Sequence, residues 1–296
     1  MSEVLSISGL SKRYGKLRAL NNLDLTIEKG EVYGILGPNG SGKTTTLAII
    51  MDIIKANKGS FRWFGEESSY KSRQRIGATL ENPHFYPYLS ALNNLKVIAS
   101  IKDKPYKGLK DILKLVGLYD RRRDKFKNFS MGMKQRLAIA SALIGDPEVL
   151  IFDEPTNGLD PQGIAEIREL IKRIAGEGQT VLLASHLLDE VQKTCSHVAV
   201  LRKGEKLFSG NLDELSRESE IIELSSNNLE ILLEALNEID EIGEINKEGS
   251  LMLVKATPDF SSADINEILI EKGIVLSHLN LRKRSLEKEV LKLLMQ

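Results

Sequence analysis

The sequence predicts an α/β fold followed by a smaller domain, and three patterns along its 296 residues carry this prediction. Short apolar runs alternate with helical stretches between residues 149 and 201, an order typical of a parallel sheet covered by helices. The first 30 residues instead alternate between apolar and polar side chains, as antiparallel strands do. The composition then shifts near residue 216. We therefore expect a large domain over residues 1–215 and a small one over residues 216–296.

The overall composition is that of an ordinary globular protein, with 42% hydrophobic and 28% charged residues. The 41 basic and 41 acidic residues cancel, and this balance argues against a nucleic-acid partner. The single cysteine, Cys195, permits no intrachain disulfide. We expect no secretory signal, because the N-terminus lacks a basic region followed by an apolar run. We expect no membrane helix either, because no run approaches the roughly 18 apolar residues that such a helix needs.

The large domain is expected to begin with antiparallel strands over Val4–Ser8 and Ala19–Ile27, which flank a turn at Gly15. Glu31–Leu36 reads as a short apolar strand, and a helix is expected over Lys43–Ile54.

A helical subdomain is expected over about residues 83–145, because apolar residues recur there at a spacing of three to four. Beyond it, strands are expected over Val149–Phe152, Thr180–Ala184 and Val198–Leu201, with helices over Gln162–Ala175 and Leu187–Thr194.

The small domain is expected to follow the order strand, helix, strand, strand, helix, strand, which predicts a ferredoxin-like unit. Its expected elements are Ile221–Leu224, Leu229–Ile239, Ile242–Ile245, Leu251–Lys255, Ala263–Lys272 and Ile274–Leu279, with a last helix over Ser285–Leu294. Three roles stay open for this domain, namely regulation, stabilisation of a dimer, or a cap on the sheet.

A glycine-rich segment follows the strand that ends at Leu36. It matches the spacing G-x-x-x-x-G-K-S/T over Gly37, Pro38, Asn39, Gly40, Ser41, Gly42, Lys43, Thr44 and Thr45. Glycines let the backbone wrap closely around a phosphate, so that successive N–H groups point at it, and the following helix adds its positive end. Lys43 is placed to bridge the β- and γ-phosphates, and the Thr44 hydroxyl to ligate Mg²⁺. We therefore expect ATP and Mg²⁺ as the ligands.

An apolar strand over Val149–Phe152 ends in two carboxylates, Asp153 and Glu154. A parallel strand delivers its carboxyl-terminal residues to the ligand edge of the sheet. We expect Asp153 to hold Mg²⁺ through water, and Glu154 to orient or deprotonate the water that attacks the γ-phosphate. A solvated strand end is the alternative, and the phosphate loop upstream argues against it.

These motifs lie in one fixed order with further segments at Tyr14, Glu81, Phe129–Gln135, Gly158–Asp160 and His186. In that order the chain resembles the nucleotide-binding subunits of ATP-binding cassette (ABC) transporters over roughly residues 4–210. The resemblance implies a P-loop NTPase of the ABC ATPase type. It combines an N-terminal antiparallel β subdomain, a helical subdomain and, in this chain, a small C-terminal α+β extension.

The resemblance also implies roles for single residues. Tyr14 would stack on adenine, and His186 would contact the γ-phosphate and take part in catalysis with Glu154 and Lys43. Glu81 would contact Mg²⁺ or the attacking water. A plain β-edge aromatic is the alternative for Tyr14, and a structural histidine is the alternative for His186.

Three residues of the signature and D-loop segments complete the implied nucleotide site. The hydroxyl of Ser130 and the close-approach position Gly132 would contact the γ-phosphate held by a second cassette. Asp160 belongs to the D-loop, and it is also placed to cap the helix that starts near Pro161.

Two kinds of partner are implied by the same resemblance. One is a second cassette, either a copy of this chain or a homologue, and the other is an integral-membrane permease. The expected docking groove runs from Asn82 to Asn94, with a well-packed loop as the alternative. The expected location is cytoplasmic, on the inner face of the cell membrane. The run Arg121–Arg123 is placed to contact lipid headgroups, but a solvated face is the commoner role of such a run.

Two departures from the family pattern stand out. Glu81 occupies the place of the usual glutamine and adds negative charge beside phosphate, so we expect it to alter Mg²⁺ dependence or the coupling of hydrolysis to the partner. The signature has methionines at Met131 and Met133 in place of a glycine and a glutamine, a variant similar to those of bacterial drug and antibiotic exporters.

These features favour the hypothesis that the chain is the ATPase subunit of a bacterial exporter for a drug, an antibiotic peptide or a lipid-like substrate. An importer ATPase is one alternative. A soluble ABC ATPase acting on ribosomes or DNA is another. Ribosome-associated members usually carry two cassettes in one chain, whereas each motif occurs once here. Repair members insert long coiled coils between the phosphate loop and the signature, and no sustained heptads separate Thr45 from Ser130.

Overall fold

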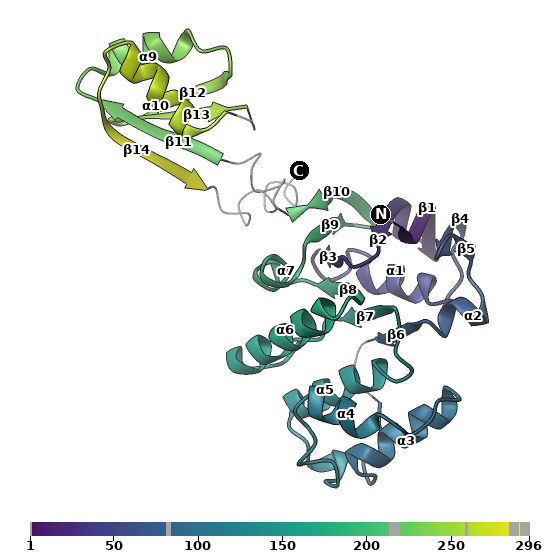
Figure 1. Ribbon diagram of the computed structural model, residues 1–296. Coiled ribbons are helices and arrows are strands. Elements are labelled where there is room, and N and C mark those ends of the chain that lie inside the picture. The colour runs from purple at the N-terminus through teal and green to yellow at the C-terminus, as the bar shows by residue number, and fades with distance from the viewer. Residues whose placement is uncertain (1, 81–83, 213–219, 258–259, 284–289, 291–296) are drawn as a thin grey trace. The chain divides into compact units, whose positions relative to one another are not determined.

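The computed structural model describes residues 2–80, 84–212, 220–257, 260–283 and 290. The chain divides into two units, Met1–Gly210 and Asn211–Gln296 (Figure 1). The boundary expected between residues 215 and 216 lies outside the described residues.

A six-stranded sheet organises the first unit, in the order β10-β9-β3-β8-β7-β6. Its strands are β3 (Val32–Leu36), β6 (Ile76–Thr79), β7 (Val149–Asp153), β8 (Thr180–Ser185), β9 (His197–Arg202) and β10 (Glu205–Asn211). The strands from β9 to β6 pair in parallel. Every residue of β7 and β8 is buried, which explains their continuous apolar runs. The expected strands at residues 149, 180 and 198 are thus confirmed.

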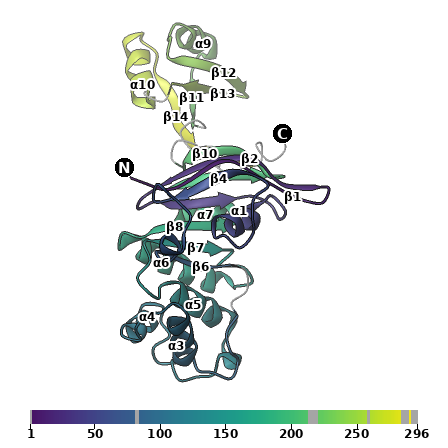
Figure 2. The same cartoon turned by 90° about the vertical axis from the view of Figure 1, so that its right-hand side faces the viewer.

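An antiparallel sheet is formed by the N-terminal strands, in the order β2-β1-β4-β5. Its strands are β1 (Glu3–Tyr14), β2 (Leu17–Glu28), β4 (Lys58–Trp63) and β5 (Glu66–Glu67). Helix α1 (Lys43–Ile50) lies between this sheet and the six-stranded one (Figure 2). Trp63 is buried there and its indole N–H donates to the carbonyl of Ile50 at 2.8 Å.

Helix α1 is shorter than the sequence predicted, since it ends at Ile50 and not at Ile54. The reason lies in the backbone of Asp52, whose φ of 57° is a left-handed conformation that an α-helix does not continue. Apolar residues beyond this point, such as Met51 and Ile54, still pack on the core. Their spacing is therefore the same as that of a longer helix, which is why the sequence predicted one.

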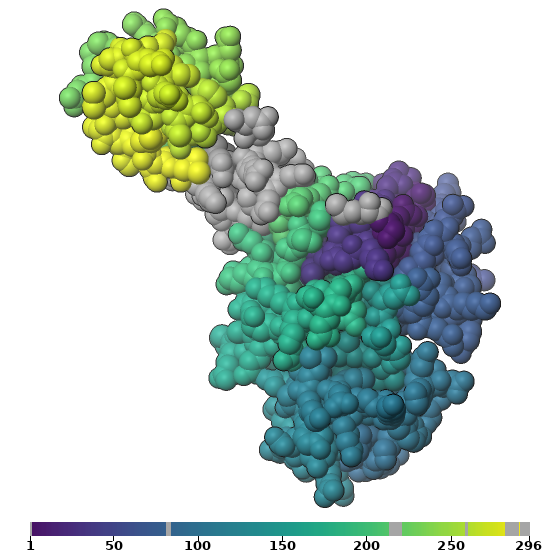
Figure 3. Space-filling model, viewed as in Figure 1, coloured from purple at the N-terminus to yellow at the C-terminus, as the bar shows by residue number. Residues whose placement is uncertain are grey.

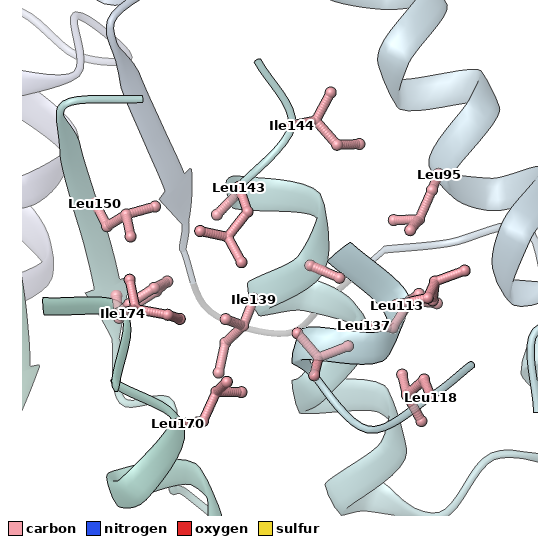
Figure 4. Close-up of a cluster of buried hydrophobic side chains, with 14 of the residues drawn as sticks. Leu95, Leu113, Leu118, Leu137, Ile139, Leu143, Ile144, Leu150, Leu170 and Ile174 are labelled. Carbon is pink, nitrogen blue, oxygen red and sulfur yellow. The ribbon is translucent and has the colours of Figure 1, made fainter. Parts of the chain in front are cut away.

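The expected helical subdomain is confirmed, and it forms one lobe of the first unit (Figure 3). It contains α3 (Ala91–Ile101), α4 (Leu109–Leu115), a 3₁₀ turn over Phe126–Asn128 and α5 (Met131–Ala142). Aliphatic side chains from these helices meet side chains of β7 and of α6 (Pro161–Gly176) in a single cluster (Figure 4). Leu95, Leu137 and Ile174 are completely buried in it. Two short helices, α2 (Tyr70–Arg73) and α7 (Leu188–Thr194), complete the unit.

The second unit has the expected order of strand, helix, strand, strand, helix, strand. Its elements are β11 (Glu220–Ser226), α9 (Leu229–Asn237), β12 (Ile242–Glu248), β13 (Leu251–Ala256), α10 (Ser262–Glu271) and β14 (Leu276–Lys283). The strands form an antiparallel sheet in the order β12-β13-β11-β14, which is the arrangement of a ferredoxin-like unit. Side chains from the sheet and both helices share one core that includes Leu224, Leu236 and Ile265.

The last expected helix, Ser285–Leu294, lies outside the described residues except for residue 290. Within the ranges that the structure describes, none of the helices combines the length and the apolar character needed to cross a membrane.

Candidate active site

The phosphate loop occupies the turn from β3 into α1, and its backbone is packed on both sides. A side chain at Gly37 would place its Cβ 2.3 Å from the carbonyl oxygen of Leu201, which is an impossible contact. Gly42 has a φ of 108°, and a Cβ there would lie 2.7 Å from the carbonyl oxygen of Ala19. Both positions therefore require glycine, Gly37 because of the close approach alone and Gly42 because of its close approach and its left-handed backbone.

Hydrogen bonds fix the same loop against its neighbours. The N–H of Gly37 donates to the carbonyl of Ser185 on β8 at 3.3 Å, and the N–H of Gly204 donates to the carbonyl of Ser41 at 2.9 Å. Pro38, Asn39 and Gly40 form the exposed crest of the loop. The Ser41 hydroxyl is buried and makes no hydrogen bond to any residue in the described ranges, so it is a donor that a ligand in the loop can use.

Lys43 extends from the first turn of α1 back over the loop. Its side chain is buried, and its ammonium donates to the carbonyl of Gly37 at 2.8 Å. The same ammonium lies 3.3 Å from the carboxylate of Glu154. A buried ammonium that is held among backbone carbonyls and one carboxylate presents its charge at a defined point of the loop.

Thr44 and Asp153 bring a hydroxyl and a carboxylate together. Asp153 is the last residue of β7 and is 4% exposed, and its Oδ2 accepts a hydrogen bond of 2.8 Å from the Thr44 hydroxyl. Both are hard oxygen donors, and one carboxylate with a hydroxyl and substrate phosphates is the donor set that Mg²⁺ uses in nucleotide sites. These two residues therefore fit the expected metal. Thr45 lies beside them in the first turn of α1.

Glu154 lies just beyond β7 in a constrained backbone conformation. Its φ is 49°, and its N–H donates to the carbonyl of Ala184 at 2.9 Å. Its carboxylate lies 2.8 Å from Nδ1 of His186, which follows β8. The hydroxyl of Ser185 accepts from the N–H of Leu187 at 3.0 Å and so shapes the turn that carries the histidine. Strained conformations of this kind persist where the surroundings enforce them, often at functional sites.

The signature and D-loop segments meet at a second place. Ser130 caps α5 by accepting from the N–H of Met133 at 3.3 Å, and Asp160 caps α6 by accepting from the N–H of Gly163 at 3.0 Å. The helix-capping part of the Asp160 expectation is thus confirmed. Ser130, Gly132 and Asp160 line one surface cavity of about 520 Å³. No hydrogen bond or ion pair joins these three to the phosphate loop in the part of the chain described.

The two signature methionines have different surroundings. Met133 packs against the core of the helical subdomain, which accounts for an apolar residue at that position. Met131 is 41% exposed, and its terminal methyl lies 3.6 Å from where a Cβ on Gly158 would be. Met131 and Gly158 thus lie close together on the wall of the same cavity.

An ion pair that no sequence pattern predicts connects helix α5, which begins in the signature, with helix α6, which follows the D-loop. Arg136 of α5 contacts Glu166 of α6, and the amide of Gln162 donates to Glu166 at 3.1 Å. The residues are 30 positions apart and match no short motif. An i, i+4 spacing predicts ion pairs only within one helix. This pair could therefore be recognised only from the packing of α5 against α6.

Two further expected site residues stand apart from these contacts. Tyr14 ends β1 and is 48% exposed, with the ammonium of Lys12 lying 5.3 Å from its ring centroid. Half of the side chain is thus accessible to a planar ligand, and the expected stacking on adenine stays a prediction. Glu81 lies outside the described residues, as do Asn82 and Pro83, so its expected contacts with Mg²⁺ or water stay a prediction.

Comparison with known proteins shows where this architecture recurs. The ABC transporter family model matches residues 20–157. The lantibiotic transport ATP-binding protein SrtF of Streptococcus pyogenes is 41% identical, over 72% of this chain and 95% of SrtF. The bacitracin transport ATP-binding protein BcrA of Bacillus licheniformis is 34% identical, over 99% of this chain and 98% of BcrA.

A solved structure is similar to this chain as well. The dimeric structure of MJ0796, a bacterial ABC transporter cassette, aligns with a TM-score of 0.64 and 28% identity, over 70% of this chain and 98% of that one. These matches confirm the expected fold class together with binding and hydrolysis of ATP. The chain belongs to the ABC transporter family, as one of its ATP-binding cassettes.

Proposed function

We propose that this chain is the ATPase subunit of a bacterial exporter that removes antibiotic peptides through a separate membrane permease. The observation that carries this proposal is the match to a bacitracin transport protein over 99% of the chain, which includes the second unit. The match to the lantibiotic transport protein supports the same class of substrate. A cytoplasmic location, on the inner face of the membrane, follows from this role.

The hydrolytic step is assigned to residues that contact one another. Glu154 orients or deprotonates the attacking water, because its carboxylate is held between Lys43 and His186. Lys43 and the loop N–H groups bind the β- and γ-phosphates. Thr44 and Asp153 would hold Mg²⁺, which neutralises charge on the phosphate oxygens when bound. His186 keeps the Glu154 carboxylate in place and contacts the γ-phosphate.

A second cassette completes the site in this proposal. Ser130, Gly132 and Asp160 share one exposed cavity and make no polar contact with the phosphate loop among the described residues. They are available to the nucleotide of a partner cassette, and the dimeric form of a related cassette supports that arrangement. ATP then joins two cassettes, and its hydrolysis allows them to separate.

The permease is proposed to dock beside the helical subdomain. A groove of about 330 Å³ is lined there by His84, Phe85, Tyr86, Asn94, Val97, Ile98 and Ile101. The Asn94 side chain fixes its wall, since its amide oxygen accepts from the N–H of Tyr86 at 2.8 Å. An aromatic and aliphatic groove of this kind suits a helix with apolar anchors.

Two measurements test the proposed function. Affinity capture of the chain from detergent-solubilised membranes of its host should recover an integral-membrane protein, whereas recovery of ribosomes would contradict the proposal. Deletion of the gene should sensitise the host to bacitracin-like or lantibiotic peptides. Wild-type chain and the Glu169→Gln control, on the exposed face of α6, should restore resistance, and Glu154→Gln should not. Restoration by Glu154→Gln would show that hydrolysis is not required.

A further inference from the structure

Residues 121–127 follow the second helix of the helical subdomain and form turns that lead into the 3₁₀ turn over Phe126–Asn128. The side chains at every second position are exposed, and these are Arg121, Arg123, Lys125 and Lys127. Between them, Phe126 is buried in the core of the subdomain. Four exposed cations therefore face solvent within one short segment.

Three of these cations are not neutralised. Arg121 pairs with Asp124, and the intervening Arg122 donates to the carbonyl of Tyr119 at 2.8 Å and lies over its ring. By contrast, Arg123, Lys125 and Lys127 form no ion pair with any residue in the described ranges. Their charges therefore face solvent uncompensated.

Two exposed tyrosines lie beside this segment. The N–H of Lys127 donates to the carbonyl of Pro87 at 3.0 Å, and Lys125 forms a β-bridge with Ser90. Pro87 is flanked by Tyr86 and Tyr88, which are 48% and 63% exposed, with ring centroids 5.8 Å apart. The segment around Pro87 and the segment 121–127 thus present aromatic rings and cations next to each other.

We propose that this surface, made of Arg123, Lys125, Lys127, Tyr86 and Tyr88, binds the anionic phospholipid headgroups of the membrane. We call it the cationic edge. The inference rests on the proposed function only in that the cassette works at a membrane. Basic residues near a membrane are attracted to its anionic lipids, and tyrosine rings are enriched at the interface, where one end is apolar and the other is hydrated.

The chemistry of the cationic edge favours lipid over an acidic segment of a protein. Two of its three cations are lysines, which act as mobile point charges and not as a bidentate fork for one carboxylate. The adjoining groove, in which Tyr86 and Asn94 lie, offers apolar contacts to a protein helix. Attachment of the cationic edge to headgroups would hold that groove at the membrane surface, where a permease segment emerges.

Vesicle sedimentation of the purified full-length chain tests the inference. We expect strong partitioning onto vesicles of phosphatidylglycerol and phosphatidylcholine, and weak partitioning onto phosphatidylcholine alone. The Arg123→Gln/Lys125→Gln/Lys127→Gln variant should bind the anionic vesicles roughly a hundredfold more weakly, at roughly fivefold per charge removed. The Tyr86→Ser/Tyr88→Ser variant should also bind more weakly. High salt should suppress binding, since exposed charges are screened.

The matched control removes three exposed cations elsewhere, through Lys29→Gln, Lys58→Gln and Lys206→Gln, and should bind within a fewfold of wild type. ATP turnover of the cationic-edge variant should stay normal, which shows that it folds. Equal binding of the variant and wild type, or equal loss in the control, would overturn the inference. The inference would also be overturned if the cationic-edge variant lost permease capture but kept its binding to vesicles. That result would show that the cationic edge binds a protein. Failure of permease capture by wild type alone would contradict the proposed function and not this inference.

Discussion

The ammonium of Lys43 lies 3.3 Å from the carboxylate of Glu154, so the phosphate loop and the end of β7 are joined by a charge pair. The other oxygen of the same carboxylate contacts His186 at 2.8 Å. Both carboxylate oxygens of Glu154 are therefore fixed by contacts within the protein. A carboxylate that is fixed in this way loses little freedom when it positions water, which is the advantage of preorganised catalytic groups.

The hydrogen bond between Thr44 and Asp153 leads to a prediction about Mg²⁺. Thr44→Val keeps the shape of the side chain but removes the oxygen that we assign to the metal. The Mg²⁺ concentration for half-maximal ATP turnover should rise roughly tenfold, equivalent to about 1.4 kcal/mol. ATP binding measured in the presence of a chelator should be unchanged. Thr26→Val on the exposed face of β2 is the control, and an unchanged Mg²⁺ titration in Thr44→Val would remove threonine from the metal site.

Glu81 carries a second prediction about the metal. Glu81→Gln removes one negative charge beside the expected phosphate position. We expect a changed Mg²⁺ dependence of turnover, or a changed ratio of transport to hydrolysis, when Mg²⁺ titrations and transport are measured in parallel. Glu67→Gln, on an exposed strand, provides a control with the same charge change. Unaltered turnover, Mg²⁺ dependence and transport would show that the departure at position 81 has no functional effect.

The pair of Arg136 and Glu166 should position the signature relative to the D-loop. Arg136→Gln and Glu166→Gln should each lower turnover severalfold, and the double variant should be no worse than either single one. Such non-additivity is expected for residues that act as a unit. ATP-dependent dimerisation should weaken in parallel, while ATP affinity of the isolated cassette stays constant. Additive losses in the double variant would argue that the two residues act separately.

Lys102 predicts a pH dependence of stability. Its ammonium donates to the carbonyl of Ser141 at 3.1 Å, but burial, with a smaller contribution from the charge of Lys104, lowers the pKa of Lys102 to about 8. The unfolded chain has the higher pKa and binds the proton more readily between pH 8 and pH 10.5, so the free energy of unfolding should rise with pH across that window.

The comparison with Lys102→Met isolates this effect from other titrating groups. The free energy of unfolding of wild type, minus that of the variant, should increase by about 2 kcal/mol between pH 8 and pH 10. Chemical denaturation at the two pH values measures it. A difference that stays flat, or falls, over this range would mean that the Lys102 amine has its ordinary pKa in the folded protein.

The sequence was most informative where a motif fixes both chemistry and position. The glycine loop, Asp153 and Glu154 follow short buried strands, and parallel strands end at a common edge of the sheet. Their contacts with one another followed from that rule. The order of strands and helices in the second unit was likewise readable, because each element has a clear period and a turn at its end.

Contacts between segments distant in the sequence could not be predicted in the same way. The ion pair of Arg136 and Glu166 depends on how α5 packs on α6. The exposed cations of residues 121–127 gain their tyrosine neighbours through backbone contacts with a distant segment, such as the hydrogen bond from Lys127 to Pro87 and the β-bridge from Lys125 to Ser90. The predicted end of α1 was wrong, because apolar residues continue past Asp52. The left-handed backbone of Asp52 ends the helix, and no glycine or proline in the sequence indicates it.

The central claim is that Glu154 activates water in an ATP-bound pair of cassettes, and Glu154→Gln tests it most directly. ATP turnover and the oligomeric state in MgATP should be measured together, by phosphate release and light scattering, with Glu169→Gln as the control. The variant should bind ATP, lose turnover by at least about a hundredfold and accumulate as an ATP-bound dimer. Normal turnover by Glu154→Gln, with no accumulated dimer, would contradict the role given to Glu154 and the shared site built around it.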